Sequence, residues 1–226
     1  MKLQAVGEDA LMLYLGDGAA VNTLAQVQAA STAIEAALGD DLTDLVPSYA
    51  SVLILYNPLC SHRSEIARRV RHALKSLAAA PVAPGRSVVL PVYYAAESGA
   101  DLASLAAAAG LTTAEVIDLH CATQYRVYAI GFAPGFAYLG EVDSRIAAPR
   151  LATPRARVPR GSVAIADRQT AVYPSESPGG WNLIGRCPTP MFTPDAQPSM
   201  PVAVGDSVYF EPIDRARYLA LGGELS

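Results

Sequence analysis

The chain has 226 residues, of which 51% are hydrophobic, and a formal net charge of −4 at pH 7. This length suggests one large domain or two small ones with a substantial core. The acidic balance argues against general nucleic-acid binding. No apolar run approaches 18 residues, and Glu8 and Asp9 lie in the first ten residues, so we expect neither a membrane span nor a signal peptide.

The three cysteines, Cys60, Cys121 and Cys187, are widely spaced and form no CxxC pair. Neither a disulfide framework nor a metal site is indicated by such spacing. We therefore expect a cytoplasmic protein without a bound metal.

The first 84 residues combine apolar positions at helical spacing with short apolar runs typical of strands. We expect strands at 2–6, 10–15, 42–49 and 51–56, and helices at 19–38 and 61–80. The segment Pro81–Gly85 (PVAPG) is the best candidate for a domain boundary. The prediction is a small N-terminal α+β domain over 1–84 and a second domain over 85–226.

The second domain begins with a strand and two short helices and continues with short strands separated by turns. We expect a strand at 87–94, helices at 101–110 and from Thr112 or Thr113 to about His120, then strands at 125–130, 161–166, 169–173, 182–186 and 206–210. Many short strands with turn residues between them indicate a barrel or a sandwich.

Residues 128–192 are rich in proline and glycine. Eleven of the 17 prolines lie between Pro134 and Pro201. Glycine is favoured where the backbone turns sharply, and proline marks turns and strand edges. This composition predicts a surface of shaped loops, where binding and catalysis concentrate.

Three residues are candidates for catalysis. His120 is the histidine near the loop-rich segment and has the residue type best suited to a general base; the alternative is a helix-terminal histidine that caps carbonyl groups. Arg150 and Arg155 each follow a proline, which holds them on stiff segments suited to binding an anion. The alternative for each arginine is a structural salt bridge.

The segment Ser177-Pro178-Gly179-Gly180-Trp181 is a candidate for substrate binding. Adjacent glycines allow backbone N–H groups to converge on an anion, as in a nest, and Trp181 could form the wall of a flat pocket. The alternative is a tight turn beside a core tryptophan. Tyr138 is the aromatic residue of the preceding loop that we expect to present a polar group.

Several kinds of chemistry are excluded. Neither Lys2 nor Lys75 follows a glycine, so no P-loop exists, and neither has the context of a biotin-attachment lysine. No GxSxG motif is present. His62 and His72 are ten residues apart on an expected helix, which does not make a metal pair. The chain by itself is therefore not expected to act as an ATPase, a biotin carrier or a serine hydrolase.

Three motifs carry a resemblance to a known family: GFAPGFAYL (131–139), PRLATPRARVPRGSVAIA (149–166) and YPSESPGGWNLIGR (173–186). In order and spacing they resemble the family of the 5-oxoprolinase B subunit, also called KipI or allophanate hydrolase subunit 1. Weaker matches extend the resemblance over nearly the whole chain. One departure is Cys187, where the family usually has threonine.

The resemblance implies a cyclophilin-like β-barrel after the N-terminal α+β domain. It also implies that the chain is part of an ATP-dependent enzyme that hydrolyses 5-oxo-L-proline to L-glutamate. ATP would be bound by the complex, the 5-oxoprolinase C subunit would be a direct partner that shares the cleft, and the A subunit would be a functional partner. Arg186, which ends the third motif, joins the substrate-binding candidates.

Two other functions remain open at this point. Some members of the family inhibit a sporulation histidine kinase through the barrel domain. The third possibility is one half of a biotin-dependent carboxyltransferase acting on urea or a similar amide, with biotin on a separate chain. Genes for the A and C subunits beside this one would favour the 5-oxoprolinase.

Overall fold

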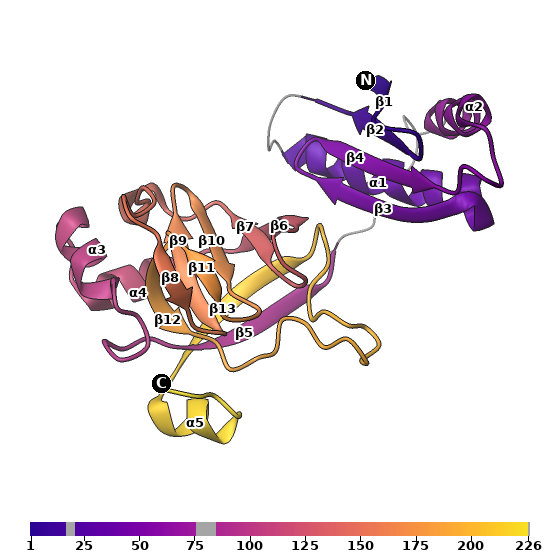
Figure 1. Ribbon diagram of the computed structural model, residues 1–226. Helices are drawn as coiled ribbons and strands as arrows, with labels where there is room; N and C mark the ends of the chain where they lie inside the picture. Colours follow the sequence, from indigo (N-terminus) through magenta and orange to yellow (C-terminus); the bar gives the residue numbers. More distant parts are fainter. Residues whose placement is uncertain (17–20, 76–84, 226) are drawn as a thin grey trace. The chain divides into compact units, whose positions relative to one another are not determined.

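A computed structural model describes residues 1–16, 21–75 and 85–225 of the protein. The chain divides into two compact units, Met1–Pro84 and Gly85–Ser226 (Figure 1). Except for Gly85, the proline-rich segment in which a boundary was expected lies outside the described residues, as do the first two residues of the first expected helix and positions 76–80 of the second.

The N-terminal unit is an antiparallel sheet covered by two helices. Its elements are β1 (Lys2–Ala5), β2 (Ala10–Tyr14), α1 (Val21–Leu38), β3 (Leu42–Ser48), β4 (Ser51–Tyr56) and α2 (Arg63–Leu74). The strand order is β1-β2-β4-β3. Buried residues of both helices, such as Ile34 and Val70, share one hydrophobic core with Leu13 and Ile54 of the sheet. Alternating burial along β4 matches a sheet with one covered face.

The C-terminal unit is a closed β-barrel, which confirms the predicted α+β class with a cyclophilin-like barrel domain. The barrel order is β10-β7-β6-β13-β5-β12-β9. Its strands are β5 (Ser87–Tyr93), β6 (Tyr125–Ile130), β7 (Ala137–Gly140), β9 (Ser162–Ala166), β10 (Gln169–Val172), β12 (Asn182–Arg186) and β13 (Ser207–Ile213). Strands β9 and β12 are buried at every position, as expected for a barrel wall covered on both sides.

The barrel contains one parallel strand pair, in which β13 runs beside β5 from Ser207 opposite Ser87 to Ile213 opposite Tyr93. Asp206, at the start of β13, accepts hydrogen bonds from the backbone N–H groups of Arg86 and Ala203. It also accepts two from the Arg86 guanidinium. This single carboxylate therefore links the residues that immediately precede the two strands.

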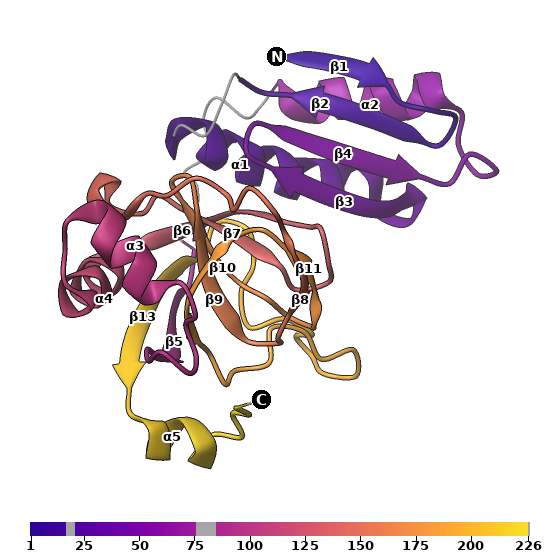
Figure 2. The same ribbon diagram turned by 60° about the vertical axis from the view of Figure 1, so that its left-hand side comes forward.

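Two helices, α3 (Leu102–Ala109) and α4 (Thr113–Ala122), pack against the barrel (Figure 2). A capping box formed by Thr112 and Glu115 begins α4, so the structure selects Thr112 from the two threonines that the sequence offered as the cap. Leu105 of α3 and Val116 of α4 are buried in the barrel core. The helices therefore belong to the same hydrophobic unit as the strands.

Strands β8 (Arg155–Val158) and β11 (Ser177–Gly179) form a separate two-stranded sheet, which the sequence analysis did not predict. Strand β7 and helix α5 (Arg215–Ala220) were also missed. The sequence of β11 is Ser-Pro-Gly, residue types that are depleted in strands, and only the pairing with β8 gives it an extended conformation.

Candidate functional site

A small pocket, the aromatic pocket, lies where the first and third sequence motifs meet. Its volume is about 110 Å³. It is lined by Phe132, Phe136, Tyr138, Arg150, Tyr173, Pro178, Gly179, Gly180 and Trp181. Five of the nine residues are aromatic and one is a cation, so the pocket suits a flat ligand that carries negative charge.

The loop before β7 builds one side of the aromatic pocket. Gly135 has φ +83°, and a Cβ at this position would meet the Met191 carbonyl oxygen at 2.4 Å, so glycine is required there. Phe132 also has a positive φ, 73°, which is costly for a bulky residue, and its side chain is 66% exposed. The tight loop thus places Phe136 in the core and Phe132 at the rim.

Phe136 is the centre of the aromatic cluster beneath the pocket. Its ring lies 5.2 Å from the Tyr173 ring and 5.6 Å from the Trp181 ring, both nearly perpendicular to it. Tyr138 packs at 4.9 Å in the same edge-to-face manner. These geometries are favourable for aromatic pairs, and they fix the walls of the pocket. Trp181 is 5% exposed and belongs to the buried aromatic cluster, as the core alternative expected, and it also lines the pocket.

The two adjacent glycines do not form the anion-binding nest that the sequence suggested. A nest needs a residue in the left-handed region, and neither Gly179 nor Gly180 has a positive φ. Glycine is needed at position 179 because of packing: a Cβ there would lie 2.3 Å from the Tyr173 hydroxyl. Ser177 is a half-buried residue of β11 that pairs with Val158 and does not line the aromatic pocket.

Arg150 is the cation of the aromatic pocket. Its Cζ lies 5.9 Å from the centre of the Trp181 ring, within cation–π distance. Among the described residues no carboxylate forms an ion pair with it, and it is exposed. Burial raises the pKa of Tyr173, while the charge of Arg150 acts in the opposite direction. A guanidinium near an aromatic wall and without a carboxylate partner is available to bind an anionic group.

Arg155, predicted as a second anion-binding arginine, is a structural residue instead. Its Nη2 donates to Asp101 Oδ1 at 2.7 Å, and the other oxygen of Asp101 accepts from the backbone N–H of Leu183 at 2.7 Å. Asp101 is buried. The ion pair therefore ties β8 to the start of α3 and to β12, which is the salt-bridge alternative left open by the sequence.

His120, predicted as a general base, lies in the barrel core. Its side chain is fully buried, and Nδ1 and Nε2 are 2.7 Å from the Tyr94 hydroxyl and 2.9 Å from Thr170 Oγ1. Its ring stacks on Phe210 at 4.5 Å. Burial lowers the pKa of His120 to about 3, so it is neutral at physiological pH. A histidine sealed from solvent with both nitrogens occupied is not placed to take a proton from a substrate or water.

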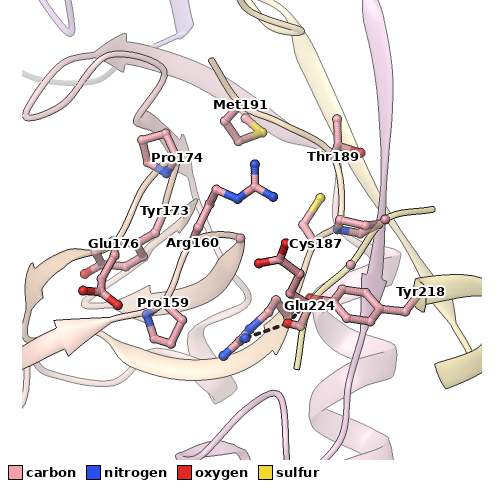
Figure 3. Close-up of a pocket in the computed structure, with 15 residues that line it drawn as sticks. Pro159, Arg160, Tyr173, Pro174, Glu176, Cys187, Thr189, Met191, Tyr218 and Glu224 are labelled. Atoms are coloured by element: carbon pink, nitrogen blue, oxygen red, sulfur yellow. Dashed lines mark hydrogen bonds between the residues drawn. The ribbon is translucent and has the colours of Figure 1, made fainter. Parts of the chain in front are cut away.

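A second and larger cavity, the C-terminal pocket, has a volume of about 290 Å³ (Figure 3). Arg186 is one of the residues that line it. It is 6% exposed, and its Nη1 donates to the Glu224 carbonyl at 2.9 Å. The predicted binding residues therefore separate: Arg150, Tyr138, Gly179, Gly180 and Trp181 line the aromatic pocket, and Arg186 lines the other.

Sequence reasoning missed Tyr173 and Phe136 as pocket residues, and it missed Asp101 as the partner of Arg155. Tyr173 begins the third motif, so its position was a usable signal. Asp101 is 54 residues from Arg155, and no local pattern relates them. In the described part of the chain no group of three or more metal-binding side chains occurs.

No single described helix is long and apolar enough to cross a membrane. Taken together, α3 and α4 would be long and apolar enough, but they are bent by 92° relative to each other.

The chain matches a family model described as carboxyltransferase domain, subdomain C and D, over residues 1–202. It is 35% identical to the 5-oxoprolinase B subunit of Bacillus subtilis (strain 168) over 97% of this chain and 95% of that protein. With the 5-oxoprolinase B subunit of Escherichia coli O157:H7 it shares 36% identity over 76% of this chain and 78% of that protein. The chain belongs to the family of the 5-oxoprolinase B subunit.

Solved structures share the fold of this chain. TTHA0988 has a TM-score of 0.80 and 34% identity over 91% of this chain, which spans 40% of that longer chain. Conserved uncharacterized protein PH0987 from Pyrococcus horikoshii has a TM-score of 0.58 and 38% identity, covering 96% of this chain and 100% of that one. The urea amidolyase of K. lactis, at 13% identity and a TM-score of 0.73, shares the fold over 96% of this chain and 15% of its own.

Proposed function

We propose that this chain is the B subunit of an ATP-dependent 5-oxoprolinase complex that hydrolyses 5-oxo-L-proline to L-glutamate. The observation that carries the proposal is the 35% identity, over nearly full length, to a relative of that name. Its partners in the complex are the C subunit, in direct contact, and the A subunit.

The aromatic pocket supports this substrate. 5-Oxoproline is a small, flat lactam with one carboxylate. Trp181, Tyr138 and Phe136 offer the apolar walls that such a ring needs, and Arg150 offers a charge-assisted contact to the carboxylate. In this arrangement the chain binds and orients the substrate, and the lactam carbonyl is presented to a neighbouring subunit.

The chemistry explains why a complex is needed. An amide is a poor electrophile, so the lactam oxygen accepts the γ-phosphoryl group of ATP and ADP leaves. Water then attacks the carbon, and the C–N bond breaks as the nitrogen takes a proton. A second water hydrolyses the resulting acyl phosphate to the carboxylate of glutamate and free phosphate. Holding lactam, ATP and water together requires several binding groups. This chain has no P-loop, and we therefore assign ATP to the assembled complex.

The test is co-expression of this chain with the neighbouring subunit genes, followed by an assay for ATP-dependent formation of glutamate from 5-oxoproline. We expect turnover by the complex and none by the isolated chain, which also should not hydrolyse ATP. Omission of each subunit in turn is the control. Turnover by the isolated chain, or no turnover by the complete set, would contradict the proposal.

A further inference from the structure

The C-terminal pocket is separate from the aromatic pocket, and Tyr173 is the residue that lines both. The C-terminal pocket is lined by Arg186, at the end of β12, and by Gly223 and Glu224, in the segment that follows α5. With a volume of about 290 Å³ it is large enough to hold a small molecule.

A buried positive charge forms part of this pocket. Arg186 is 6% exposed, its Nε is buried without a hydrogen-bond partner, and its Nη1 donates to a neutral backbone carbonyl. No carboxylate within the described segments forms an ion pair with it. A buried charge is costly unless an opposite charge compensates it. The pocket wall therefore carries uncompensated positive charge.

A second arginine reaches into the same space. Arg160 is exposed, projects into the pocket in Figure 3, and forms no ion pair in the described part of the chain. Its backbone is held by its neighbours. Gly161, with φ +78°, lies so close to the Cys187 carbonyl that a Cβ would meet that oxygen at 2.3 Å, and Pro159 restricts the other side. Arg160 thus starts from a fixed turn that directs it at the pocket.

Of the two carboxylates at the pocket, one is already paired with an arginine and the other, among the described residues, is not. Glu176 forms an ion pair with Arg157 at 3.2 Å. The backbone carbonyl of Glu224 accepts from Arg186 and from the Tyr218 hydroxyl, both at 2.9 Å, and its carboxylate projects into the pocket without an ion pair to any described residue. Glu224 is therefore the internal acid that competes with an anionic ligand.

The thiol of the pocket does not add negative charge. Burial raises the pKa of Cys187 to about 11, so this group is neutral at physiological pH and is a poor nucleophile.

We propose that the C-terminal pocket is a binding site for a small oxyanion, a carboxylate or a phosphate, with Arg160 as the contacting residue. Arg186 adds charge from the wall, where weak solvent screening strengthens its effect. A guanidinium binds either kind of oxyanion through paired N–H groups. This proposal does not depend on which substrate the aromatic pocket binds.

The test is a titration of the isolated full chain by calorimetry at constant ionic strength, with inorganic phosphate in one arm and L-glutamate in the other. We expect saturable binding in at least one arm, and the stronger arm identifies the source of the oxyanion. Arg160→Ala should weaken that binding tenfold or more, and Glu224→Gln should strengthen it severalfold by removing the competing charge. Arg168→Ala, an exposed arginine paired with Glu141, is the charge-matched control and should bind like the parent chain.

Binding that needs Arg160 and is unaffected in the Arg168 variant supports the site. No saturation in either arm, or unchanged affinity in Arg160→Ala, would overturn it. Arg160 is exposed, so its variant is expected to fold, and unfolding curves check this directly. Because the readout is binding by the isolated chain, its failure is distinguishable from failure of the 5-oxoprolinase assignment, which is read as turnover by the complex.

Discussion

At the residue scale, Arg150 is the cation best placed to recognise a substrate carboxylate. In the reconstituted complex, Arg150→Ala should lower kcat/KM for 5-oxoproline by roughly 30- to 1,000-fold, since one charge-assisted contact is worth about 2–4 kcal/mol. Arg150→Lys should recover part of the loss, because lysine keeps the charge without the fork geometry. The free energy of unfolding should not change, since Arg150 is exposed. A near-normal kcat/KM in the Arg150→Ala variant would show that Arg150 does not bind the substrate.

The two glycines of the third motif offer a matched pair of variants. A Cβ at Gly179 would lie 2.3 Å from the Tyr173 hydroxyl, whereas a Cβ at Gly180 would make its nearest contact at 3.6 Å, an ordinary distance. Gly179→Ala should therefore cost about 1–3 kcal/mol of stability through overpacking, and Gly180→Ala should be nearly neutral. Urea denaturation of both variants measures this. Equal stabilities would show that Tyr173 moves aside freely.

At the scale of elements, His120 links α4 to two strands of the barrel, through Thr170 of β10 and Phe210 of β13. Burial lowers its pKa from 6.5 to about 3, so between these values the unfolded chain binds a proton that the folded chain does not. Stability should therefore fall as the pH drops below about 6.5, with a contribution from His120 of about 2 kcal/mol between pH 7 and pH 5.

Denaturation curves at pH 7 and pH 5 test this contribution. His120→Gln removes the titrating group, so the variant should lose correspondingly less stability over the same interval, whatever its stability at pH 7. The same pH-dependent loss in both proteins would mean that the pKa of His120 is not lowered in the folded state.

At the scale of the whole molecule, the Pro- and Gly-rich block is the surface that we expect the 5-oxoprolinase C subunit to cover. Phe132, 66% exposed on a strained loop, lies at its rim, and large exposed aromatic residues are common anchors of interfaces. Hydrogen exchange of this chain should show increased protection within 131–186 when the C subunit is added. The N-terminal sheet is an internal reference. Unchanged protection across the block would contradict both the interface and a cleft shared between the subunits.

The sequence by itself determined the elements that depend on local patterns. Apolar patterns predicted α1 and β4, and the two adjacent threonines at 112 and 113 predicted the start of α4 to within one residue, because periodicity and capping are properties of neighbouring residues. The motifs also located the segments that build the aromatic pocket. These signals need no knowledge of distant contacts.

Only the tertiary structure decided the roles of the individual side chains. Arg150 and Arg155 look alike in the sequence, since each follows a proline, yet Asp101 pairs with Arg155 and no described carboxylate pairs with Arg150. The sequence suggested His120 as a general base, but the structure shows that it is buried inside the barrel. Whether a charged or titratable group is paired with an opposite charge, buried or exposed depends on residues that are tens of positions away in the chain. The local sequence does not show which residues these are.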